Sequence, residues 1–212
     1  MNMKNLTLFT ILIVSLAAFV ACGGEPPVSV ADEKATMEAR RTEFPVTQTA
    51  EAATRYERFA KIAPSGTVIE IDIPGNQHDD TVTYPFGELP PNGGVHHNRW
   101  QKCQVYDQPI YSHHAIHSLE HGAVWVTYQP DLDEDMVSDL EGLTRGEPFV
   151  MVSPYPNQRS PITLTSWGLQ LEVDSSDDER IDAFIRAFAN GINNQEPGAG
   201  CTSGVETVVE EA

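Results

Sequence analysis

Basic residues are scarce in this sequence. Its 212 residues include 13 lysines and arginines against 31 aspartates and glutamates, a formal net charge of −18 at pH 7 with histidine neutral. A chain this acidic is poorly suited to bind nucleic-acid phosphates, and it lacks the basic clusters that recognise anionic lipid headgroups. A strongly negative surface instead favours solubility and attracts cations. The composition therefore excludes nucleic acid as an expected partner.

Long apolar runs are also rare, and the clearest one lies at the N-terminus. Residues 6–20 follow Lys4 and carry almost no charge. This run is shorter than a typical membrane span and is typical of a cleaved secretory signal. It ends at residues 19–22 (FVAC), which resemble the bacterial lipobox. That resemblance implies a diacylated Cys22 that becomes the mature N-terminus and anchors the protein in a membrane. A plain signal peptide cut nearby is the alternative.

Export fixes the expected location and domain organisation. We expect an extracytoplasmic, lipid-anchored protein of the cell envelope, either in the periplasm or on the cell surface. After the signal peptide at 1–21, residues 22–45 are rich in glycine, proline and charge, which predicts a lipidated flexible tether. Residues 46–205 are long enough for one globular domain with a hydrophobic core, and residues 206–212 form an acidic tail.

Cysteine is nearly absent, with three residues in the chain. If Cys22 carries lipid, the two remaining thiols are those of Cys103 and Cys201. Two distant cysteines in an oxidising compartment favour a single disulfide bond. Closing a loop of about 100 residues would stabilise the fold by about 4–5 kcal/mol in the chain-entropy model. The alternative is that one cysteine binds a metal as a thiolate.

Local patterns predict strands interleaved with helices. Apolar residues spaced three and four apart indicate helices, and short apolar or alternating runs indicate strands. These patterns predict a single compact α+β or α/β domain with a small mixed sheet, flanking helices and a long loop rich in His, Pro and Gly. The expected helices are 50–62, 112–120, 133–143 and one that follows the capping segment 176–179; the expected extended segments are 67–73, 123–128, 149–153 and 162–173; the loop is 74–111.

All seven histidines of the chain lie between residues 78 and 121, most densely in residues 113–122 (HHAIHSLEHG). On a helix, His117 and His121 are four residues apart and project from one face. Two imidazoles at this spacing can bind one metal ion, and His96 lies behind flexible glycines that allow a loop to fold over the site. Met151 is a candidate thioether ligand, which would favour Cu(I). The alternative is that these imidazoles are partly buried structural groups.

Several motifs resemble a bacterial family, domain of unknown function 3105, over about residues 66–205. The resemblance implies that His96, His117, Glu120 and His121 occupy motif positions, and it supports a disulfide between Cys103 and Cys201. Members are often exported or membrane-anchored, and the family implies no established activity. The motifs are residues 90–97 (PPNGGVHH), 117–124 (HSLEHGAV), 128–130 (YQP), 152–156 (VSPYP), 166–168 (SWG) and 197–204 (PGAGCTSG).

Three functions remain open on these residues. The favoured one is an envelope lipoprotein that binds a transition metal, copper before zinc, through His96, His117, His121 and Met151, with Glu120 as a ligand or as a group that orients an imidazole. Its partners would be the membrane and a protein that donates or accepts the metal. The second is a zinc hydrolase, because residues 117–121 match His-x-x-Glu-His. The third is a non-catalytic interaction module. The balance favours a non-enzymatic protein.

Overall fold

The computed structural model describes residues 54–55, 57–61, 63, 68–71, 73 and 75–210. The chain divides into Met1–Ala39 and Arg40–Ala212, and every described residue belongs to the second unit. The expected signal peptide at 1–21, with Cys22, and the tether at 22–45 lie outside the described residues. Within the described part, no helix is long and apolar enough to cross a membrane.

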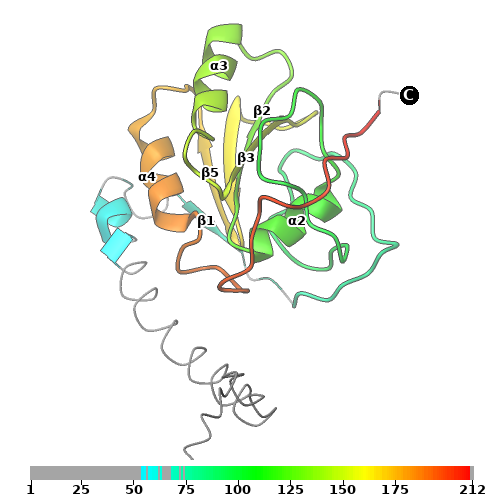
Figure 1. The fold of residues 1–212 in the computed structure, drawn as a ribbon. Coiled ribbons are helices and arrows are strands. Elements are labelled where there is room, and N and C mark those ends of the chain that lie inside the picture. The colour runs from blue at the N-terminus through cyan, green and yellow to red at the C-terminus, as the bar shows by residue number, and fades with distance from the viewer. Residues whose placement is uncertain are drawn as a thin grey trace, which may run out of the picture. The chain divides into compact units, whose positions relative to one another are not determined.

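A five-stranded mixed sheet forms the centre of the domain, with strand order β1-β5-β4-β2-β3 (Figure 1). Strands β2 and β3 are parallel and are joined through helix α3, whereas the other neighbouring pairs are antiparallel. This arrangement confirms the expected compact α+β domain with a small mixed sheet. The elements are β1 (Val68–Glu70), α2 (Ser112–Glu120), β2 (Val124–Tyr128), α3 (Glu134–Gly142), β3 (Val150–Pro154), β4 (Ile162–Ser166), β5 (Leu169–Val173) and α4 (Glu179–Phe188).

The extended segment expected at 162–173 is a hairpin in the structure. Its two halves are β4 and β5, which pair from Ile162 with Val173 to Ser166 with Leu169. The two residues of the turn are Trp167 and Gly168, and Gly168 has φ 72°, a conformation that glycine adopts without steric penalty. Apolar residues alternate along each strand, at Ile162 and Leu164 in β4 and at Leu169, Leu171 and Val173 in β5. The phase of this alternation shifts by one residue between Leu164 and Trp167, where the turn begins.

The two faces of the sheet are covered differently. Residues alternate across a strand, so Val124, Val126, Val150 and Val152 face the side that carries α4. Their neighbours Trp125 and Met151 belong to the core on the other side, together with Ala115, Ile116 and Leu119 of α2. Figure 1 shows α4 and α2 on opposite sides of the sheet.

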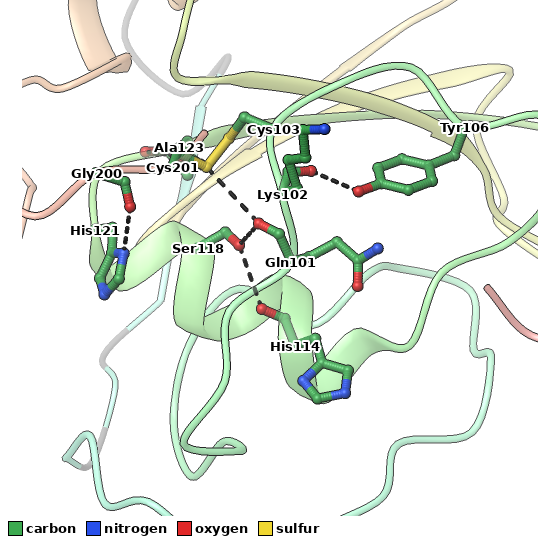
Figure 2. The surroundings of a disulfide bond; sticks show 11 residues. Gln101, Lys102, Cys103, Tyr106, His114, Ser118, His121, Ala123, Gly200 and Cys201 are labelled. Atoms are coloured by element: carbon green, nitrogen blue, oxygen red, sulfur yellow. Dashed lines mark hydrogen bonds between the residues drawn. A yellow bond between two sulfur atoms is a disulfide. The ribbon is translucent and has the colours of Figure 1, made fainter. Parts of the chain in front are cut away.

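The segment 75–111 lies against α2 and is tied to the rest of the domain at several points. Four isolated β-bridges join it to itself and to other segments: His78 with His96, Gln101 with Val205, Val105 with Val152 and Ile110 with Val208. The expected disulfide between Cys103 and Cys201 is present, with Cα atoms 5.3 Å apart (Figure 2). These connections hold the long loop in one path, and this path positions the histidines.

Candidate metal centre

Helix α2 is buried on its polar side as well as on its apolar side. Its residues from His114 to Glu120 are all buried, although four of them carry polar side chains. The carbonyls of residues 97, 99 and 101 lie along this side and accept hydrogen bonds from three α2 side chains. The bonds are His117 Nδ1 to the His97 carbonyl (2.7 Å), His114 Nδ1 to the Arg99 carbonyl (2.6 Å) and Ser118 Oγ to the Gln101 carbonyl (2.6 Å). Alternate carbonyls of residues 97–101 therefore satisfy the polar side of the helix.

These hydrogen bonds also fix which nitrogen of each imidazole is free. A carbonyl oxygen can only accept, so each Nδ1 that contacts one must carry the proton and donate. The same arrangement holds for His96, whose Nδ1 donates to the Gly94 carbonyl at 2.8 Å, and for His121, whose Nδ1 donates to the Gly200 carbonyl at 2.9 Å. In His114, His117 and His121 this leaves Nε2 for another partner, and in His96 it directs Nε2 to Glu120 Oε2 at 2.9 Å. Metal-ligating histidines are characteristically oriented by such a bond through the second nitrogen.

The first group of converging ligand atoms comes from His78, His96, His117 and Glu120, with one atom of each lying within 4.8 Å of the others. Glu120 Oε2 lies 2.9 Å from His96 Nε2 and 3.6 Å from His78 Nε2. Glu120 Oε1 accepts a hydrogen bond from Asn76 Nδ2 at 2.5 Å. Three of these four residues are buried and His78 is exposed. The group can supply three imidazole nitrogens and one carboxylate oxygen to an ion.

The protonation of this group is set by burial and by the contacts within it. Burial lowers the pKa of His117 to about 4, so its Nε2 lone pair is free at neutral pH. Burial also opposes a charge on His96, but its hydrogen bond to Glu120 raises the pKa of His96 above 6.5. For Glu120, burial raises the pKa, yet the hydrogen bonds from His96 and Asn76 outweigh it and lower the pKa below 4.5. Without a metal, His96 and Glu120 form an ion pair.

A second group shares one residue with the first. His117, His121 and Glu196 each place a ligand atom within 4.8 Å of the others. The rings of His117 and His121 are 4.6 Å apart, and His121 Nε2 is 3.4 Å from Glu196 Oε2. Trp100 covers this group, with its ring 4.9 Å from that of His121 and 5.7 Å from that of His117. The i, i+4 spacing in α2 therefore brings two imidazoles together as the sequence predicts.

The family comparison matches this same region. A family model described as "Protein of unknown function (DUF3105)" matches residues 76–203. The chain belongs to this family. The matched segment contains both ligand groups and both cysteines of the disulfide. Neither the curated proteins nor the solved structures gave a match.

The structure of this DUF3105 domain distributes the expected ligands over the two groups. His96, His117 and Glu120 lie in the first group and His121 lies in the second. Met151 is fully buried in the apolar layer between the sheet and α2, and its role as a ligand stays a prediction. Sequence reasoning missed His78, which the bridge to His96 brings beside it, and Glu196, whose backbone N–H donates to the Glu120 carbonyl.

The remaining histidines form a separate cluster. His97, His113 and His114 have ring centroids between 4.4 and 5.6 Å apart. His114 is held by the Arg99 carbonyl, and burial lowers its pKa to about 4. None of the three belongs to a group of converging ligand atoms among the described residues. In this part of the chain, the seven histidines therefore separate into four candidate ligands and three neighbours.

The disulfide lies next to the second ligand group. Cys201 follows Gly200, whose carbonyl accepts the Nδ1 proton of His121, as Figure 2 shows. The backbone N–H of Cys103 also donates to the Cys201 carbonyl at 2.7 Å. The bond between the two cysteines thus fixes the C-terminal segment that orients His121.

Proposed function

We propose that this DUF3105 protein binds a transition-metal ion, with copper as the favoured metal, as a lipid-anchored protein of the cell envelope. The convergence of Nε2 atoms and a buried carboxylate supports the metal site. The N-terminal run and the lipobox-like residues 19–22 support the anchor. Mass spectrometry of the mature N-terminus tests that second part, and an unmodified Cys22 would contradict it.

One observation carries the metal proposal. Three imidazoles from two segments, His78 and His96 from the loop and His117 from α2, direct ligand atoms to the carboxylate of Glu120. Backbone carbonyls orient His96 and His117 through Nδ1, so their ligand nitrogens point to the centre before any ion binds. Three of these four groups are buried, and several imidazoles that converge on one carboxylate are typical of a ligand set.

The donor set favours copper on affinity. Imidazole nitrogen with carboxylate oxygen suits Cu(II), Zn(II), Ni(II) and Fe(II), and the Irving–Williams order gives Cu(II) the highest affinity of the divalent ions at such a site. A negative surface raises the local concentration of any cation. A protein that holds copper outside the cytoplasm would capture it or exchange it with a donor or acceptor protein.

The zinc-hydrolase alternative is less well supported by the geometry. In the His-x-x-Glu-His arrangement both histidines bind zinc and the glutamate activates water. Here both oxygens of Glu120 already accept hydrogen bonds, from Asn76 and His96, and His121 belongs to the other ligand group. The helix also ends at Glu120, whereas that motif normally lies within a longer helix.

Metal titration of the full chain in mild detergent tests the proposal. Cu(II), Zn(II) and, under anaerobic conditions, Cu(I) are added separately, and bound metal is measured after dialysis. We expect about one Cu(II) per chain, bound more tightly than Zn(II). A full chain that retains no metal would contradict the proposal and favour the interaction module.

A matched pair of substitutions on one helix locates the site. His117→Ala removes a ligand nitrogen and should abolish stoichiometric binding, whereas His113→Ala removes an imidazole of the same helix that lies outside the ligand groups. Equal binding by both variants would remove His117 from the site. Far-UV circular dichroism checks that both variants keep the fold.

A further inference from the structure

The two ligand groups meet at the imidazole of His117. Its ring lies 4.9 Å from that of His96 and 4.8 Å from that of His78 on one side, and 4.6 Å from that of His121 on the other. Each group includes one ligand atom of His117. Two ions could occupy both groups at once only if His117 could bind both of them.

His117 has one nitrogen to offer. Its Nδ1 donates a proton to the His97 carbonyl at 2.7 Å, and a carbonyl cannot exchange roles with the imidazole. A bridging imidazolate would need Nδ1 deprotonated and turned to a second ion. The single lone pair of Nε2 binds one ion at a time. The arrangement is therefore not a pair of sites that fill together.

The two groups also differ in their access to solvent. The carboxylate of the His121 group belongs to Glu196, whose side chain is 47% exposed. The carboxylate of the other group belongs to Glu120, which is 1% exposed and also holds Asn76 and His96. An exposed carboxylate meets a cation first, and a buried one with several partners holds it in a fixed geometry.

We propose that the two groups are alternative positions for one metal ion. The outer position is formed by His117, His121 and Glu196, and the inner position by His78, His96, His117 and Glu120. The ion is captured at the outer position and moves to the inner one while it stays bound to His117. Bonds to His121 and Glu196 break as bonds to His78, His96 and Glu120 form, and the proton that His96 Nε2 shared with Glu120 is released to solvent. The oxidation state of the ion does not change. This inference rests on the proposed function.

Stoichiometry separates this inference from the function on which it rests. The full chain is dialysed against excess Cu(II), and protein-bound copper is measured. One ion per chain supports alternative positions, because both groups need His117. Two ions per chain would overturn the inference and leave the metal-binding function intact. No bound copper would overturn the function itself.

Two identical substitutions, one in each group, then test the order of binding. Glu120→Gln and Glu196→Gln each remove one carboxylate charge and keep the shape of the side chain. We expect Glu120→Gln to retain one Cu(II) at the outer position with affinity lowered by roughly 10- to 100-fold. We expect Glu196→Gln to bind one Cu(II) at the inner position and to load about 10-fold more slowly, because the capturing charge is lost.

Tryptophan fluorescence measures the loading rate, since Trp100 lies beside His121 and Trp167 lies 6.0 Å from His96. Stopped-flow mixing with Cu(II) should give quenching that slows in Glu196→Gln. His78→Asn is a second variant of the inner position, at an exposed residue, should Glu120→Gln fail to fold. An inner-position variant that folds and binds no copper, or a Glu196→Gln chain that loads at the wild-type rate, would overturn the two-position proposal.

Discussion

Helices α2 and α4 cover opposite faces of one sheet, and they differ in what lies over their polar sides. In α4, Phe184 and Phe188 are buried against the sheet, whereas Asp182 and Arg186 pair with one another in solvent. In α2 the side away from the sheet is also buried, beneath the segment that carries His97. An ordinary amphipathic helix needs only its apolar side to be covered.

This difference between the polar sides of α2 and α4 distinguishes a helix that stabilises the fold from one that holds candidate ligands in place. Burying an imidazole or a carboxylate costs free energy unless hydrogen bonds replace those to water. Helix α2 and its C-cap residue meet this requirement with backbone carbonyls of His97, Arg99 and Gly200, which bind Nδ1 and leave Nε2 of His117 and His121 for a ligand. Side chains held in this way are preorganised for a ligand. We infer that α4 contributes mainly stability and that α2 contributes the site.

The largest expected effect tests α4 as a purely structural helix. Phe184 is fully buried, and its ring packs 4.6 Å from that of Phe188 and 5.8 Å from that of Phe59. Phe184→Ala should lower the free energy of unfolding by about 3–5 kcal/mol through lost burial and a cavity. Denaturant unfolding measures this loss, and copper stoichiometry should stay at the wild-type value. A change in stoichiometry would show that α4 also supports the site.

The second prediction concerns the buried polar side of α2, which should make the stability of the domain depend on pH. Burial lowers the pKa of His114 from 6.5 to about 4 in the folded protein. Between these values the unfolded chain binds a proton that the folded chain does not, so stability is complete above pH 6.5 and falls as the pH drops towards 4. His114 alone changes the slope of the free energy of unfolding against pH by at most about 1.4 kcal/mol per pH unit.

The variant His114→Gln isolates this contribution. The amide can still donate to the Arg99 carbonyl and does not titrate, so we expect a shallower decline in the free energy of unfolding between pH 6.5 and 4. Urea unfolding at several pH values measures the slope. The same slope in both proteins would show that His114 does not resist protonation in the folded state.

The sequence alone predicts α4 and α2 well and predicts the ligand groups only in part. The residues of α4 alternate with the helical period after the capping residue Asp178, and α2 begins and ends at the residues that the sequence analysis expects. Local periodicity is sufficient for both. His78 and Glu196 have no local signal, because their positions depend on a bridge and on the path of segments far from α2. Nor does a spacing of four residues show that His117 also belongs to a second group that does not include His121.

The smallest expected effect concerns the N-terminal cap of α4. Its contribution to stability is lost in a different pH range from that of His114. Asp178 caps α4 by accepting a hydrogen bond from the Arg180 backbone N–H at 2.9 Å. Asp178→Ala should lower the free energy of unfolding by about 1 kcal/mol. The side-chain hydrogen bond from Arg180 lowers the pKa of Asp178 below 3.8, so this contribution is present above that value and is lost only as the pH falls through the lowered pKa.

The contributions of the Asp178 cap and of buried His114 to the free energy of unfolding are therefore lost in different pH ranges. Between pH 6.5 and 4 the difference in stability between wild type and Asp178→Ala should stay constant, while that between wild type and His114→Gln changes. Below pH 4 the cap variant should approach the wild type. If the Asp178→Ala difference already disappeared near pH 6, the contributions of the two helices would be lost over the same pH range, and the contrast between them would lose its physical basis.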